Sequence, residues 1–132
     1  ILAVLWEMYP DHPNLLPAFM DRRAFAAGET VVAKPLLGRE GANISIATFG
    51  GEGKPVGAPL ASLGGPYGDE GYVYQALTPL AESAGVDAVG NDVTHHAVIG
   101  SWVIDGVSRG IGIREDVGLI THNRSRFVPH LF

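Results

Sequence analysis

HHAVIGSWVIDGVSRGIGIRED, residues 95–116, contains two strand-like runs joined by a tight turn. Residues 95–106 predict a long strand that ends in Asp105-Gly106, and an Asp-Gly pair between apolar runs is a strong signal for a two-residue β-hairpin. Residues 107–116 predict a second strand that returns along the first. Because strands joined by so short a turn run antiparallel, this stretch predicts an antiparallel sheet.

The flanking segments add further strands and little helix. Residues 1–9 are apolar and predict a helix. Residues 11–19 predict a second, short helix capped by Asn14, and residues 81–94 predict a mobile surface loop. Further strands are predicted at residues 30–35, 42–49, 56–63, 71–77 and 119–123. The predicted fold class is α+β, with a largely antiparallel sheet and short helices at the start.

Size and composition limit the class of function. The chain has 132 residues, enough for one domain, and its net charge of −5 argues against nucleic-acid binding, which favours a basic surface. It has no cysteine, which excludes disulfides and fits a reducing cytoplasm. No apolar run reaches the roughly 18 residues of a membrane span. The chain starts without an initiator methionine or a basic leader, and we expect it to correspond to the end of a longer protein.

KPLLGREGANI, residues 34–44, places a lysine at a strand end before a loop that carries two glycines. A lysine is a compact cation suited to phosphate oxygens, and glycines let backbone N–H groups approach an anion. The stretch is not a Walker A motif, because the lysine precedes the glycines. Two interpretations follow: a phosphate-binding lysine with a closing loop, or an ordinary surface lysine beside a hairpin turn.

Two other strands carry candidate residues. In GIGIRED, residues 110–116, one face carries Gly110, Gly112 and Arg114, and the arginine suits either a phosphate or a neighbouring carboxylate. In GDEGYVYQAL, residues 68–77, the backbone at the strand end offers an edge for a planar base, although an aromatic core strand gives the same pattern.

The five histidines predict no metal site. His95 and His96 are adjacent and so point to opposite faces of a strand, and none of the five has the spacing of a helical ligand pair. No GxSxG motif supports serine hydrolase chemistry.

Several of these stretches, in order along the chain, resemble the C-terminal part of the glutathionylspermidine synthase family, which includes proteins described as acid–amine ligases. They are LWEMYPDHPNLLPAF (5–19), KPLLGREGANI (34–44), YVYQAL (72–77), IGSWVIDG (99–106), GIGIREDVGLIT (110–121) and RSRFVPHLF (124–132). The resemblance implies that residues 1–132 form a single domain, the C-terminal lobe of an ATP-grasp fold. It also implies a reaction in which ATP and magnesium phosphorylate a carboxylate, and an amine then attacks the acyl phosphate to form an amide.

The resemblance assigns the nucleotide site residue by residue. Lys34 matches a phosphate-binding lysine, and Gly41 matches a backbone contact to the nucleotide. Leu119 matches a position that lines the nucleotide pocket. Four positions match the strand that lies along the edge of the adenine in the family: Gln75, Ala76, Leu77 and Thr78.

The resemblance also assigns two catalytic residues. Arg39 matches a loop arginine that closes over the reacting groups, and Arg114 matches an arginine that stabilises the transferred phosphoryl group. The magnesium ligands and most of the acid site are expected upstream of this chain, so no metal ligand is predicted within it. The complete protein is then an enzyme that acts on ATP, a small carboxylate (glutathione or peptide-like) and an amine, with neither nucleic acid nor membrane as a partner.

One alternative stays open on the sequence. The chain would instead be a stand-alone, non-catalytic module that keeps the fold for nucleotide binding or protein interaction. In both cases, a surface that faces an upstream half of the protein would also favour self-association.

Overall fold

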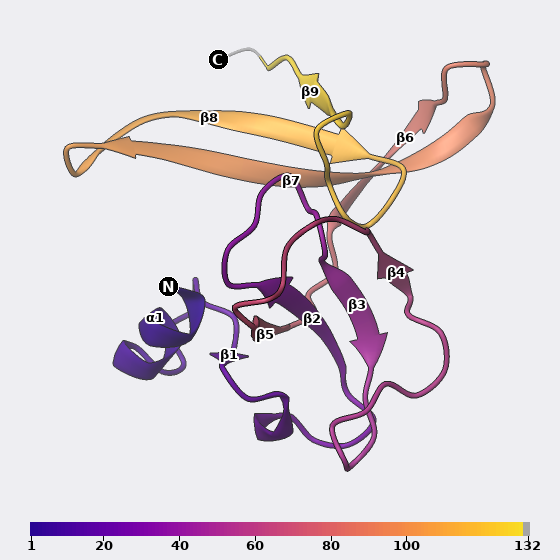
Figure 1. Ribbon diagram of the computed structural model, residues 1–132. Helices are drawn as coiled ribbons and strands as arrows, with labels where there is room; N and C mark the ends of the chain where they lie inside the picture. Colours follow the sequence, from indigo (N-terminus) through magenta and orange to yellow (C-terminus); the bar gives the residue numbers. More distant parts are fainter. Residues whose placement is uncertain (131–132) are drawn as a thin grey trace. The chain divides into compact units, whose positions relative to one another are not determined.

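The computed structural model describes residues 1–130, which fall into two compact units. Unit 1 is Ile1–Thr78 and unit 2 is Pro79–Phe132. Within the described residues, both units consist of antiparallel strands, and the only α-helix lies near the N-terminus (Figure 1). This arrangement confirms the predicted α+β class with a largely antiparallel sheet. The assignment to one domain of an ATP-grasp fold stays a prediction.

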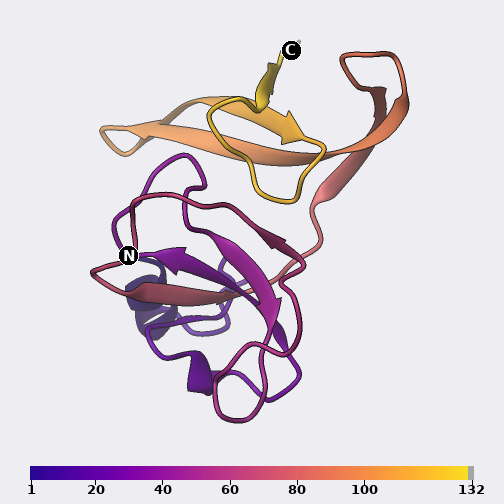
Figure 2. The same ribbon diagram turned by 45° about the vertical axis from the view of Figure 1, so that its right-hand side comes forward.

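Unit 1 consists of a short helix followed by a five-stranded sheet. Helix α1 (Leu2–Met8) confirms the helix predicted at residues 1–9, and it ends before Pro10, which cannot continue a helix. The other elements are β1 (Ala18–Phe19), the 3₁₀ turn η1 (Arg22–Ala24), β2 (Thr30–Pro35), β3 (Ser45–Thr48), β4 (Ala61–Ser62) and β5 (Tyr72–Ala76). The order across the sheet is β1-β5-β2-β3-β4, so β2 is the central strand (Figures 1 and 2).

An apolar cluster of unit 1 lies on one face of this sheet. Val31, Ala47 and Phe49 are buried together, and the rings of Phe25 and Tyr74 pack against them. The register explains the grouping, because Val31 lies directly opposite Ala47 of β3 and side chains of opposed residues share a face. Burial of this apolar surface is the main stabilising contribution in unit 1.

A buried arginine ties η1 to the turn after β3. Arg22 is only 5% exposed, and its guanidinium donates hydrogen bonds to the carbonyl oxygens of Phe25 (3.1 Å) and Gly50 (2.8 Å). The same guanidinium lies 4.7 Å from the ring centroid of Phe49, which is a cation–π distance. The sequence patterns did not single out this residue.

Unit 2 is a four-stranded antiparallel sheet in the order β6-β7-β8-β9. Its strands are β6 (Ala81–Val86), β7 (Asp92–Ile104), β8 (Val107–Asp116) and β9 (Arg126–Val128). Asp105 (φ 51°) and Gly106 (φ 72°) both adopt left-handed backbone conformations, as a type I′ turn requires. The structure therefore confirms the hairpin predicted from residues 95–116.

The prediction of a mobile loop at residues 81–94 was wrong. Residues 81–86 form strand β6, which pairs along its length with the first half of β7. The turn between them is held by Asp87, whose carboxylate accepts hydrogen bonds from the backbone N–H groups of Val89 and Asn91, both at 2.9 Å. The small polar residues of β6 hid the strand, because most of them are exposed and show no apolar alternation.

Two further predicted elements do not form. The short helix capped by Asn14 is absent, because the chain turns at His12, whose ring Nδ1 accepts a hydrogen bond from Asn14 N–H (3.2 Å). Residues 119–123 form a loop instead of a strand, and β9 follows it. In this loop the backbone bonds with side chains around Asp116 rather than with a neighbouring strand.

Candidate functional site

The predicted nucleotide-binding residues Lys34 and Gln75 meet on neighbouring strands of unit 1. Lys34 lies opposite Val73, and Val32 lies opposite Gln75, so the lysine and the glutamine are diagonal neighbours on one face of the sheet. Lys34 Nζ donates a 2.6 Å hydrogen bond to Gln75 Oε1, although the two residues are 41 positions apart in the chain. The structure therefore brings together two residues that were assigned to one site.

The Lys34 side chain is half-buried, and burial lowers the pKa of its ammonium below the ordinary lysine value. Its hydrogen-bond partner, Gln75, carries no charge. Among residues 1–130, no ion pair involves Lys34. A half-buried cation that lacks a counter-ion is suited to an anionic ligand, because a negative group would offset its lost hydration.

The loop after β2 holds Arg39 and Gly41. Arg39 is exposed, with its Nε 4.0 Å from a carboxylate oxygen of Glu40. Glu40 (φ 56°) and Gly41 (φ 74°) are both left-handed, a conformation that suits glycine and is uncommon for glutamate. The far end of the loop is fixed, because Asn43 Oδ1 accepts a 2.9 Å hydrogen bond from the backbone N–H of Tyr67. The predicted roles of Arg39 and Gly41 are not tested by these contacts.

Of the four residues predicted to contact the edge of the adenine, two lie in β5 and two follow it. Gln75 and Ala76 belong to the strand, and Ala76 N–H is already bonded to the carbonyl of Pro17 (2.9 Å). Leu77 and Thr78 follow the strand and are exposed. The adenine contact therefore stays a prediction.

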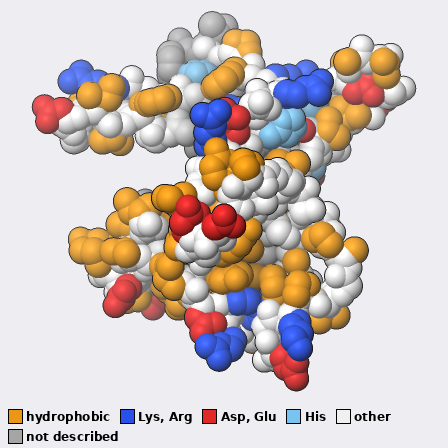
Figure 3. Space-filling model, in the orientation of Figure 1, with side chains coloured by type: hydrophobic (Ala, Val, Ile, Leu, Met, Phe, Trp, Pro, Cys, Tyr) orange, Lys and Arg blue, Asp and Glu red, His pale blue; other side chains and the backbone are white. Residues whose placement is uncertain are grey.

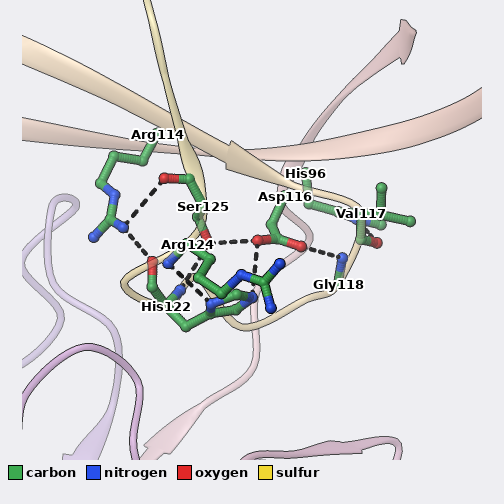
Figure 4. Close-up of polar contacts among 8 residues, drawn as sticks. All are labelled: His96, Arg114, Asp116, Val117, Gly118, His122, Arg124 and Ser125. Atoms are coloured by element: carbon green, nitrogen blue, oxygen red, sulfur yellow. Dashed lines mark hydrogen bonds and ion pairs between the residues drawn. The ribbon is translucent and has the colours of Figure 1, made fainter. Parts of the chain in front are cut away.

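Arg114 and Leu119, the remaining predicted residues, lie in unit 2. Arg114 Nη2 donates hydrogen bonds to the carbonyl oxygens of His122 and Ser125 (3.4 Å for the latter), as Figure 4 shows. Its guanidinium lies 5.2 Å from the ring centroid of Phe127. In this structure Arg114 thus holds the loop after β8, and Leu119 lies within that loop, half-buried. A contact of either residue with a nucleotide stays a prediction.

The same loop is organised by Asp116 (Figure 4). Its carboxylate accepts hydrogen bonds from the Ser125 hydroxyl and from Gly118 N–H (3.1 Å), and it lies 3.2 Å from His122 Nε2. Burial acts to raise the pKa of Asp116, but these hydrogen bonds and the nearby His122 lower it below the ordinary value. The Ser125 hydroxyl donates to the carboxylate and accepts from His122 N–H, so it is engaged in holding the loop.

A second polar group in unit 2 centres on His95, which is only 4% exposed. Arg126 Nη2 lies 3.1 Å from His95 Nδ1 and 2.6 Å from Glu115 Oε1. A side chain at position 85 would overlap the imidazole ring, so the glycine there makes the space for it. Sequence patterns missed this group because its members come from three strands.

A hollow of about 390 Å³ lies beside these two groups. Its wall is formed by Val86, Asp87, Ala88, His95, Glu115, Asp116, Val117, Arg124, Ser125 and Arg126. Several of its charged side chains pair with one another, as Arg126 does with Glu115.

No group of three or more histidine, aspartate or glutamate side chains within residues 1–130 is arranged to hold a metal ion. In the same part of the chain, no helix has the length and apolarity to cross a bilayer.

The sequence model of the family described as "Glutathionylspermidine synthase preATP-grasp" matches residues 1–132. The chain belongs to this family. Among its relatives is a Haemophilus influenzae protein named "Putative acid--amine ligase", which is 41% identical over 137 residues that cover 100% of this chain. The trypanothione synthetase of Crithidia fasciculata is 32% identical over 127 residues that cover 96% of this chain.

Membership of the glutathionylspermidine synthase preATP-grasp family confirms the resemblance to these synthases and places the chain among ligase relatives. The chain spans only 31% of the length of the Haemophilus protein and 17% of the Crithidia protein. Nucleotide binding by this chain and the activity of a complete protein therefore stay predictions.

Proposed function

We propose that the chain provides the nucleotide-binding part of an ATP-dependent carboxylate–amine ligase that acts through an acyl phosphate. The observation that carries this proposal is the state of Lys34. It is a half-buried cation on the central strand of a sheet, its pKa is lowered by burial, and a neutral amide is its hydrogen-bond partner. Family membership supports the same conclusion, since the relatives are named as ligases.

The residues of this chain would bind and orient rather than act as nucleophiles. Lys34 would neutralise a phosphate of the nucleotide, and Gln75 would hold the ammonium in place. Arg39 would approach from the loop, and Arg114 would stabilise the phosphoryl group during its transfer after releasing the loop carbonyls. ATP would supply the phosphoryl group that activates the carboxylate. The magnesium ligands would come from a part of the complete protein that this chain does not span.

The first test is nucleotide binding by Lys34→Ala. The loss of a lysine–phosphate contact should cost about 1.5–3 kcal/mol, which weakens ADP or ATP binding about tenfold or more. Isothermal titration calorimetry on the longest available form of the protein measures this directly. Lys54→Ala is the matched control, because Lys54 is an exposed lysine paired with Glu52 in a turn of the same unit. Equal affinity of the Lys34 variant and the parent would show that this lysine does not bind phosphate.

The second test separates a ligase from a non-catalytic module. The complete protein is given ATP, magnesium and a panel of peptides and polyamines, and phosphate release is measured. Release that requires both a carboxylate and an amine is the expected result. Nucleotide binding without release in the presence of any pair would favour the non-catalytic alternative.

A further inference from the structure

The β7–β8 hairpin of unit 2 extends beyond its neighbours in the sheet. The pairing of β6 with β7 ends at Ala97, and the pairing of β9 with β8 begins at Ile113. Among the residues that the structure describes, 98–112, named here the arm, therefore pair only with each other. A two-stranded hairpin is marginally stable in water by itself, because it has no second layer to cover its side chains.

The arm is apolar and exposed on both faces. Trp102 on one face is 65% exposed, and Ile99 and Val103 on the other are each 64% exposed. The exposed large apolar residues of the arm are Val98, Ile99, Trp102, Val103, Ile104, Val107 and Ile111. Apolar side chains are visible along the hairpin at the upper left of Figure 3. Exposed apolar surface of this extent marks an interaction site.

Two interior glycines leave part of the arm without side chains on one face, and the Trp102 ring lies beside one of them, Gly112. Gly100 and Gly112 lie directly opposite each other on the face that carries Trp102. Glycine in a strand interior commonly marks a place where another chain or a ligand comes near the backbone. Within residues 79–130 the outer edges of both strands have no strand partner along the arm, so they also offer backbone hydrogen-bond groups.

We infer that the arm docks, with both faces covered, against the part of a longer ligase polypeptide that this chain does not span. The Haemophilus protein matches the whole chain, arm included, within only 31% of its length. The same polypeptide thus carries more than twice as much further sequence that is available to cover the arm. This inference does not depend on the nucleotide site.

Other occupants fit less well. A bilayer would receive the arm tip first, but the tip is the Asp105-Gly106 turn and Arg109 lies close to it, which places charge where insertion would begin. A second copy of the arm would cover one face of the hairpin and leave the other face exposed. The two-sided exposure favours a partner that encloses the arm.

The test uses single thiols, because the sequence contains no cysteine. Ile99→Cys and Trp102→Cys report the two faces of the arm. Val89→Cys is the control, because Val89 is 82% exposed in the β6–β7 turn of the same unit. The alkylation rate at each position is read by peptide mass spectrometry without nucleotide, first in the 132-residue chain. It is then read in a chimera in which this chain replaces the matching segment of the Haemophilus protein.

All three thiols should react quickly in the 132-residue chain. In the chimera the thiols at positions 99 and 102 should react at least tenfold more slowly, while the thiol at 89 is unchanged. Fast reaction of either arm thiol in the chimera would overturn the proposal. So would slow reaction in the 132-residue chain together with a dimer in sedimentation, since a second copy would then cover the arm.

A second measurement does not depend on the folding of the chimera. Hydrogen exchange is followed in the natural Haemophilus protein over the peptides that match residues 98–112, and in the 132-residue chain. Slow exchange in the long protein with fast exchange in the short one supports docking. Equally fast exchange in both overturns it.

Discussion

Arg22 and Lys34 are two cations of unit 1 withdrawn from solvent, and their surroundings differ. Arg22 is bonded to two backbone carbonyls and lies over an aromatic ring. Lys34 has a hydrogen bond to one neutral side chain, Gln75. The arginine donates two hydrogen bonds within the fold, whereas the lysine donates one and retains capacity to donate to a ligand. The two residues call for different tests.

The lowered pKa of Lys34 predicts how nucleotide binding depends on pH. As the pH rises, Lys34 should lose its proton below the ordinary lysine value, and ADP affinity should fall in that window. The free protein should gain stability over the same window, because the unfolded chain holds that proton to higher pH. Calorimetric titrations between about pH 7 and 10 would reveal the decline. An affinity that stays constant to the ordinary lysine pKa would contradict a phosphate contact.

Replacing Arg22 should destabilise unit 1. Arg22→Met retains much of the apolar stem but leaves the carbonyls of Phe25 and Gly50 without their donor, at a cost of about 1.5–3 kcal/mol. Denaturant unfolding measures the loss. Arg23→Met is the control, because Arg23 is exposed and its ion pair with Asp21 is open to water, so little change is expected. Equal effects of the two substitutions would argue against the buried role of Arg22.

At the scale of the element, strand β6 shows how a strand forms without apolar alternation. Its residues are mostly exposed, and Gly85 leaves the space that the His95 ring occupies. His95 is in turn held by Arg126, which pairs with Glu115. The strand is thus fixed by its pairing with β7 and by one buried ring, rather than by an apolar face of its own.

Gly85→Ala should therefore destabilise unit 2 by about 1–3 kcal/mol, because the new methyl group overlaps the His95 ring. Thermal or denaturant unfolding provides the measurement. Gly100→Ala is the matched control, since a Cβ at this strand glycine meets its nearest atom, Gly112 O, at an ordinary 3.7 Å. The double variant Gly85→Ala with His95→Ala should recover part of the space. Tolerance of Gly85→Ala alone would refute the packing argument.

The loop around Asp116 should loosen in acid. The folded-state pKa of Asp116 is lowered, so its contribution to stability is complete above the ordinary aspartate pKa of about 3.9 and is lost as the pH falls through the lower folded value. Exchange of the backbone amides of residues 117–125 between pH 6 and about 3 would follow this change. Asp116→Asn should show faster exchange already at pH 6. An identical pH profile in that variant would show that other groups control the loop.

The sequence allowed prediction of the elements that carry strong local signals. Strands β2 and β8 formed at their predicted residues, and the Asp105-Gly106 turn formed as expected. Pairings between distant segments left no local signal. The family resemblance assigned Lys34 and Gln75 to one site, but it did not predict their diagonal contact. The contacts of Asp116 and His95 were not predicted either, because all three contacts depend on register across strands.

At the scale of the whole molecule, the two units differ in what they bury. In the described part of unit 1, the least exposed side chains are mainly apolar, such as Val31, Ala47 and Phe49. Among residues 79–130 of unit 2 they are Ile120, His95 and Ser125, of which only Ile120 is apolar. Apolar burial is the larger stabilising term, so unit 1 should be the more resistant to local opening.

Hydrogen exchange of the 132-residue chain should show this difference. The amides of β2 and β5 in unit 1 should exchange slowest, because β2 is the central strand beside the apolar core. Those of β7 and β8 should exchange faster, and fastest along residues 98–112. Mass spectrometry over a time course at neutral pH provides the comparison. Slowest exchange in β8 would reverse the expected order of stability.

The central place of β2 also restricts how this sequence can vary in length. An added or deleted residue between Thr30 and Lys34 would shift the strand by one position and turn the lysine to the opposite face. Residues 36–42 carry no such restriction, since they belong to no strand. During evolution, insertions are therefore expected in that loop and not between Thr30 and Lys34.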